Sequence, residues 1–200
     1  MQTVAIEGTL RSEFTKSSTK AIRKESGVPC VMYGGEQVVH FHAHENTFTK
    51  LVYTPDFKVA EVTVDGTTSR AVMKDIQFHP VTDKIMHIDF IELVPGQIVR
   101  TQLPIRVVGT APGVKTGGKL LQNMRRANVM TTPEALVESL TVDVSTLELG
   151  KSVRIRDIKT TDGITVTTDP ATPVATVEIP RALRSAMDGE DGEEGEKEEA

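Results

Sequence analysis

The sequence predicts a mainly β protein with short helices, organised as two β-rich domains. Two observations predict this class. β-branched and polar residues alternate with the period of two that is typical of half-buried strands, and turn-forming pairs such as Asp65-Gly66 separate the alternating stretches. The length of 200 residues permits two domains, because each can bury a core of its own.

The first half alternates helix and strand signals. Residues 18–25 contain no β-branched run and are followed by Gly27, and residues 45–51 precede the stop Tyr53-Thr-Pro55, so both predict short helices. The alternating stretches predict strands at residues 59–64, 70–76 and 85–90, with a turn at 80–83 before the last of them. We therefore expect a small antiparallel β domain over residues 1–94.

A turn at Val94-Pro95-Gly96 predicts the boundary between the two domains. A new set of strand-like stretches follows it, joined by Gly and Asp turns, and no long amphipathic helix interrupts them. The stretches are residues 98–108, 139–144, 152–158, 164–168 and 174–179. We expect a second β-rich domain over residues 95–181.

The C-terminal segment carries most of the negative charge. The chain has a net charge of -5, but residues 188–200 alone hold eight acidic residues and one Lys, so residues 1–187 carry +2. After a short helical stretch at 181–187, this composition is too charged and too poor in apolar residues to pack. We expect residues 182–200 to form a disordered acidic tail on a slightly basic folded body.

Composition also limits the classes of function. Cys30 stands alone, so no intrachain disulfide can form, and no run of about 18 apolar residues predicts a membrane span. The first residues do not resemble a secretion signal, so we expect a soluble cytoplasmic protein. The chain has no Trp and 4% aromatic residues, so any contact with RNA should depend on charge and hydrogen bonds.

The densest basic segment lies between residues 11 and 24. Five cations oppose one Glu there, and hydroxyl side chains lie between them, which suits phosphate and ribose oxygens. A solvated basic loop and helix would have the same composition.

A second polar feature follows the predicted turn at 80–83. Alternation places His87 and Asp89 on one strand face, opposite the apolar Ile88 and Phe90. An Asp on a phosphate-binding surface is best used as an acceptor for a base edge, above all that of guanine. A surface His–Asp pair that stabilises the strand is the alternative. Residues two apart seldom donate to each other at the angle that a catalytic triad requires, so we expect no catalytic residue.

Two further patterns are weaker. His40, His42 and His44 share one face of an extended segment, a spacing that zinc sites use, but no Cys or carboxylate cluster completes a site. Residues 113–120 approach a phosphate-binding loop, yet Leu120 stands where a Ser or Thr should bind magnesium, and no clear helix follows. We interpret this segment as a Gly-rich turn and expect neither a metal nor a cofactor.

Four motifs in order resemble a known family. The stretches KSSTKAIRKESGVPCVMYGG and DIQFHPVTDKIMHIDF, followed by LPIRVVGTAPGVKTGGKL and LTVDVSTLELGKSV, are similar to the bacterial large-subunit ribosomal protein family L-twenty-five. They resemble its long two-domain form, the Ctc or general stress protein. The resemblance covers about nine tenths of the chain. It implies an N-terminal barrel of six or seven strands that binds 5S rRNA, and a C-terminal β domain.

The resemblance also implies partners and contact residues. The partners are 5S rRNA and neighbouring large-subunit proteins, with no membrane and no small-molecule substrate, for a ribosome-bound protein of the cytoplasm. The implied RNA contacts are Arg11, Arg23, Tyr33, His87 and Asp89, with Lys16, Thr19, Lys20, Gln77 and His79 around them. A protein that binds a partner through its second domain, with RNA binding incidental, is the rival hypothesis.

Overall fold

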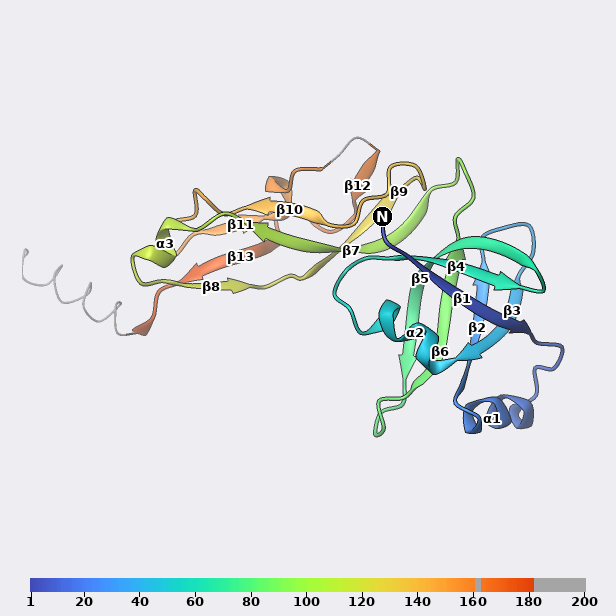
Figure 1. Ribbon diagram of the computed structural model, residues 1–200. Helices are drawn as coiled ribbons and strands as arrows, with labels where there is room; N and C mark the ends of the chain where they lie inside the picture. The colour runs from blue at the N-terminus through green and yellow to red at the C-terminus, as the bar shows by residue number, and fades with distance from the viewer. Residues whose placement is uncertain (161–162, 182–200) are drawn as a thin grey trace, which may run out of the picture. The chain divides into compact units, whose positions relative to one another are not determined.

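The computed structural model describes residues 1–160 and 163–181. Six strands form a closed barrel in the order β1-β3-β2-β6-β5-β4 (Figure 1). The strands are β1 (Thr3–Leu10), β2 (Gly27–Tyr33), β3 (Val39–His44), β4 (Val59–Val64), β5 (Thr67–Phe78) and β6 (Ile85–Glu92). Helix α1 (Lys16–Lys24) connects β1 to β2, and α2 (Glu45–Val52) connects β3 to β4.

The barrel closes because its first strand pairs with two others. β1 pairs antiparallel with β3 and parallel with β4, and β2 also runs parallel to β6. The prediction of an antiparallel domain was therefore wrong for two of the six strand pairs. The sequence pattern shows which residues form strands, but the two parallel pairs join strands that are separated by helices and long connections.

Aromatic side chains occupy the centre of the barrel core. The rings of Phe41 and Phe48 lie 5.9 and 6.3 Å from the ring of Phe90, and all three side chains are fully buried. The hairpin from β4 to β5 turns through Asp65 and Gly66, whose φ angles of 47° and 80° match the two-residue turn that suits strand twist. The same two residues predicted this turn in the sequence.

The strands after Val94 form two further sheets. One has the order β10-β7-β9-β12 and the other β11-β13-β8. Their strands are β7 (Val99–Val108), β8 (Lys119–Gln122), β9 (Arg126–Thr131), β10 (Leu140–Asp143), β11 (Ser152–Arg154), β12 (Ile164–Val166) and β13 (Pro173–Glu178). The predicted class, mainly β with an N-terminal barrel and a second β-rich part, is confirmed.

The predicted turn at residues 94–96 is present. The N–H of Gln97 donates to the carbonyl oxygen of Val94 at 3.2 Å, and Gly96 has a φ of 80°. The chain divides into two compact units. Among the described residues, the first unit contains residues 1–104, 128–139 and 163–167, and the second contains residues 105–127, 140–160 and 168–181. The division into domains at residues 94 and 95 stays a prediction.

Local structure differs from the prediction in several places. Residues 152–158 do not form one strand, because β11 ends at Arg154 and a 3-10 helix (Ile155–Asp157) follows, in which the Asp157 carboxylate accepts the N–H of Arg154 at 2.9 Å. The predicted Gly-rich turn includes a four-residue helix, α3 (Pro112–Lys115). Strands β8 and β9 were not predicted. The helix expected at 181–187 and the acidic tail lie outside the described residues, apart from Arg181.

Candidate nucleic-acid interface

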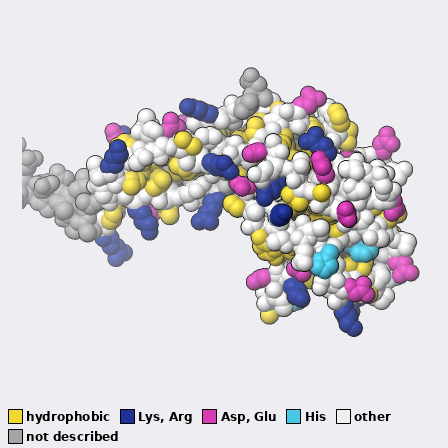
Figure 2. Space-filling model, in the orientation of Figure 1, with side chains coloured by type: hydrophobic (Ala, Val, Ile, Leu, Met, Phe, Trp, Pro, Cys, Tyr) yellow, Lys and Arg dark blue, Asp and Glu magenta, His cyan; other side chains and the backbone are white. Residues whose placement is uncertain are grey.

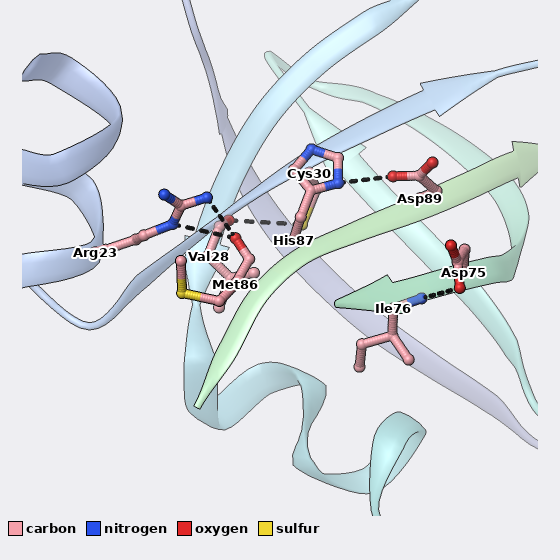
Figure 3. A network of polar contacts seen from close by, with 8 residues as sticks. All are labelled: Arg23, Val28, Cys30, Asp75, Ile76, Met86, His87 and Asp89. Atoms are coloured by element: carbon pink, nitrogen blue, oxygen red, sulfur yellow. Dashed lines mark hydrogen bonds and ion pairs between the residues drawn. The ribbon is translucent and has the colours of Figure 1, made fainter. Parts of the chain in front are cut away.

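A histidine and an aspartate form an ion pair on the outer face of β6. His87 Nδ1 lies 2.7 Å from Asp89 Oδ1, and the two side chains are 27% and 31% exposed. The prediction that they share a face holds, and the two side chains form the surface His–Asp pair that the sequence left open as an alternative. The pair fixes the imidazole with Nδ1 toward Asp89, so Nε2 is the nitrogen that remains for another partner (Figure 3).

The neighbouring strand extends this polar face. Gln77 of β5 lies opposite His87, and Asp75 lies opposite Asp89. Two carboxylates directly opposite each other repel, and the imidazole beside Asp89 offsets this repulsion when it is protonated. Asp75 was missed by the sequence analysis. Asp75 begins the sequence motif that also contains Gln77, but its spacing from the other polar residues did not indicate that it lies on the same face.

Tyr33 lies at the end of β2, next to this acidic pair. Burial raises the pKa of the Tyr33 hydroxyl above its ordinary value, and the negative charges of Asp89 and Asp75 raise it further. The hydroxyl therefore stays protonated at neutral pH and can donate a hydrogen bond. The position is half-buried, which suits a ring packed at the strand end with a hydroxyl that reaches a ligand.

Arg23 joins helix α1 to the polar strand face. Its Nε and Nη2 donate to the backbone oxygen of Met86, at 3.2 and 3.0 Å, and Met86 immediately precedes His87 (Figure 3). Nη1 is not used in this contact. The helix thus brings a guanidinium to the end of β6 that carries the His–Asp pair.

Arg11 and Thr19 hold the start of α1. Arg11 Nη2 donates to Thr19 Oγ1 at 3.0 Å and to the backbone carbonyl oxygen of Glu13 at 3.3 Å. The Arg11 guanidinium lies 5.8 Å from the centre of the Phe14 ring. Thr15 caps the helix by accepting the N–H of Ser18. Arg11 Nε is buried and has no hydrogen-bond partner among the described residues. Arg11 is thus partly a structural residue of this segment.

Lys16 and Lys20 are exposed on α1, and His79 lies at the turn after β5. His79 Nδ1 accepts the N–H groups of Val81 and Thr82, both at 3.3 Å, which orders the turn. A pocket of about 90 Å³ lies between α1 and this turn. Its lining includes Arg23, His79 and Lys84, so the structure brings the first two together and adds a cation that the sequence analysis missed.

The predicted RNA contacts therefore fall into two groups. Tyr33, Gln77, His87 and Asp89 belong to the strand face, and Arg11, Lys16, Thr19, Lys20 and Arg23 to the α1 segment and the residues before it. Arg23 connects the groups through Met86, and His79 lies at the turn beside Arg23. One surface of the barrel thus combines cations with hydrogen-bonding groups that can accept as well as donate.

The three histidines of β3 do not form a metal site. His40 stacks edge-on against Phe14 with ring centres 4.7 Å apart, and His44 Nδ1 caps α2 by accepting the N–H of Asn46. His42 is half-buried, with Nδ1 unpartnered. In the part of the chain that the structure describes, no group of three His, Cys, Asp or Glu residues could hold a metal ion. Two of the three imidazoles thus pack against a ring or cap a helix. Histidines reach the surface of the barrel in Figure 2.

Two further findings concern the single cysteine and the helices. Cys30 is buried in the barrel, and burial raises the pKa of its thiol far above the ordinary value. The described helices include none that is long and apolar enough to cross a membrane.

Comparisons with known proteins agree on one family. Residues 6–90 match the model of the ribosomal L25p family, and residues 98–181 match the model of the C-terminal domain of ribosomal protein TL5. The chain is similar to the large ribosomal subunit protein bL25 of Porphyromonas gingivalis, with 40% identity over 93% of this chain and 97% of the relative. The proteins of the same name from Bacteroides fragilis and Cytophaga hutchinsonii are 39% and 38% identical, over 93% and 92% of this chain and 97% and 95% of their own lengths.

Proposed function

The chain belongs to the ribosomal L25p family, and from that premise we propose that its N-terminal barrel binds 5S rRNA through α1 and the outer face of β5 and β6. Proteins of this family are structural rather than catalytic. The chain is accordingly a non-enzymatic protein of the large ribosomal subunit, which functions on the ribosome in the cytoplasm and assembles with rRNA and other ribosomal proteins.

The observation that carries the proposal is the contact between Arg23 and Met86. It places a cationic helix against a strand face that carries an oriented imidazole and two carboxylates. Cations supply affinity for any polynucleotide, because they replace the counterions of the phosphates. Carboxylate side chains supply discrimination, because they bond to base edges and are repelled by phosphates, and an amide side chain can bond to a base edge as well. A surface with both groups is suited to one particular RNA.

The geometry supports the following individual roles within this proposal. Lys16, Lys20 and Arg23 bind phosphates, and the hydroxyls of Thr19 and Tyr33 bond phosphate or ribose oxygens. His87 uses Nε2, because Nδ1 is held by Asp89. Asp89 and Gln77 read base edges, for which the amino and imino groups of guanine are the best fit to a carboxylate. Arg11 and His79 order the segments that carry the other groups, and they add contacts with their remaining nitrogens.

The test is a titration of the full chain with 5S rRNA and with an unrelated RNA of equal length, at near-physiological salt. The variants are Arg23→Ala and, as a control with the same change of charge on the same helix, Lys24→Ala. Arg23→Ala should weaken binding to 5S rRNA by about tenfold or more, in keeping with roughly 1–3 kcal/mol for a well-placed arginine, and Lys24→Ala by much less.

Two outcomes would contradict the proposal. Equal weak binding of the unchanged protein to both RNAs would leave only a general basic patch. In that case a protein partner of the second β-rich part becomes the better hypothesis. Equal losses for Arg23→Ala and Lys24→Ala would show that only the total charge of α1 matters.

A further inference from the structure

A second pair of cations, Lys74 of β5 and Arg100 of β7, is not part of the candidate interface, and it begins at an irregularity in β5. The pairing of β5 with β6 shifts register between Met73 and Asp75, so Lys74 has no partner on the neighbouring strand. Met73 and Ile76 both pack against the barrel core although they are three residues apart. The extra residue of this bulge therefore leaves Lys74 and Asp75, two consecutive residues, outside the core.

The bulge separates the charges of these two residues. Asp75 lies opposite Asp89 and belongs to the strand face described above. Lys74 instead donates from Nζ to the backbone oxygen of Arg100 at 3.1 Å. Lys74 makes no ion pair in the part of the chain that the structure describes, so its charge is not compensated by a carboxylate.

Lys74 and Arg100 line one pocket, of about 240 Å³. Its other lining residues are Thr101, Gln102, Asn128, Val129 and Thr167, and all seven belong to the first compact unit. Thr101 is 6% exposed, so the pocket reaches a buried hydroxyl-bearing side chain. The described lining thus combines two cations with hydroxyl and amide groups, and includes neither a carboxylate nor an aromatic ring.

This lining selects a class of ligand. Cations with hydroxyl and amide donors are the groups that bind phosphate oxygens in complexes with nucleic acids. The lack of an aromatic ring among the lining residues gives a base no surface on which to stack. The volume is below the roughly 300–1,000 Å³ of pockets that hold whole drug-sized ligands, so a single ionic group fits it better than a cofactor.

We propose that the pocket lined by Lys74 and Arg100 binds a backbone phosphate of ribosomal RNA, as a contact separate from the candidate interface on α1, β5 and β6. Lys74 retains two of its three N–H donors for this contact, and the guanidinium of Arg100 can grip a phosphate with two. The proposal requires the ribosomal role of the chain but does not require that the barrel face binds 5S rRNA.

The test compares the full chain with the variant Lys74→Gln/Arg100→Gln and with a control, Lys115→Gln/Lys119→Gln, which removes two exposed cations elsewhere. Binding is measured to free 5S rRNA and to large ribosomal subunits stripped of this protein, between about 50 and 200 mM salt. Each lost phosphate contact should lower the slope of log affinity against log salt by about 0.7–0.9. When salt rises over this range, the factor by which affinity falls should therefore be about 2.5–3.5 times smaller for the pocket variant than for the unchanged chain.

The two RNA samples distinguish the sources of the phosphate. A reduced slope with free 5S rRNA assigns it to that molecule, and a reduced slope with stripped subunits alone assigns it to other ribosomal RNA. Either result supports the proposal, whatever Arg23→Ala does to 5S binding. A slope that equals that of the control on both samples would overturn it, as would weaker binding with an unchanged slope, which indicates a protein partner. The single variants Lys74→Gln and Arg100→Gln, with melting curves, guard against a folding defect.

Discussion

The barrel and the strands that follow Val94 are both β structures, but they are built from different side chains. All eight aromatic residues and all five histidines of the chain lie within residues 1–90. The barrel core contains three phenylalanines, whereas the buried residues of the second compact unit are Ala, Val, Ile, Leu and Gly. Aromatic rings and imidazoles are thus concentrated in the barrel, whereas the pocket lined by Lys74 and Arg100 offers cations, hydroxyls and amides, which suit phosphates.

The difference teaches that the same fold class can serve two kinds of contact. Rigid aromatic packing holds the face with His87 and Asp89 in a fixed geometry, which base recognition requires. A phosphate contact tolerates a looser frame, because the attraction between charges has little directional preference. Mutations in each part of the chain test this contrast between a rigid recognition face and a looser phosphate contact.

The largest expected effect is on the barrel core. Phe90→Ala removes a fully buried ring and should cost about 3–5 kcal/mol of unfolding free energy, while Leu140→Ala in the other compact unit should cost about 2–5 kcal/mol. Urea denaturation followed by tyrosine fluorescence reports on the barrel, because Tyr33 and Tyr53 both lie in it and the chain has no Trp. Phe90→Ala should shift the tyrosine transition strongly and Leu140→Ala little. Equal shifts would show that the two parts unfold as one.

The next effect concerns discrimination between RNAs. Asp89→Asn removes the charge that orients His87 and changes an acceptor for base edges. It should lower the preference for 5S rRNA over an unrelated RNA by about 1–3 kcal/mol in competition binding, with little change for the unrelated RNA. Asp143→Asn is the matched control, since that exposed carboxylate lies in the other compact unit and accepts hydrogen bonds from the backbone N–H and the side chain of Ser145. An equal loss of affinity for both RNAs would exclude base reading by Asp89.

A smaller effect arises from the buried thiol. Burial raises the pKa of the Cys30 thiol in the folded state, whereas the same thiol in the unfolded chain has a pKa of about 8.5. The unfolded state therefore loses its proton first, so this contribution to stability is complete below about pH 8.5 and falls above it, by about 1.4 kcal/mol per pH unit. Urea denaturation of the unchanged chain and Cys30→Ala, at about pH 8 and about pH 10, measures it. A stability difference that stays constant between the two pH values would contradict the prediction.

The smallest effect is local. Thr15 caps α1 with its side chain, whereas α3 begins at a Pro and has no side-chain cap. Thr15→Ala should destabilise α1 by about 1 kcal/mol, visible as faster amide exchange at Ser18, with Ser12→Ala as the control. Unchanged exchange would show that α1 is held by Arg11 and Arg23 rather than by its cap.

Local patterns in the sequence predicted part of this structure. The strand at residues 59–64 and the turn after it agree with β4 and the Asp65-Gly66 hairpin, because alternation and turn chemistry act over a few residues. Strands β8 and β9 escaped notice. KLLQ has only four residues, and the buried face of RANVMT carries Ala, Val and Thr, which give a weak apolar signal, so both strands depend on pairing with β13 and β12. Pairing between distant segments leaves no local pattern.

The same limit applies to the candidate interface. Alternation placed His87 and Asp89 on one face, and the basic segment was evident from its composition. The contact of Arg23 with Met86 joins residues 63 positions apart, so no spacing could predict it. Asp75 was missed because uninterrupted alternation from Met73 would point it into the core, and only the bulge at Lys74 leaves it outside.

The closure of the barrel through β1 has a consequence for synthesis of the chain. β1 is made first, yet one of its partners is β4, and the circle is complete only when β6 has been made up to Glu92. The hydrophobic cluster of Val59, Val72 and Leu136 can form only later, when the chain has been made as far as Leu136. Until then β1 has an open edge that another nascent strand could pair with. Every new copy of this ribosomal protein is therefore vulnerable while a ribosome is making it, and is protected once the circle closes.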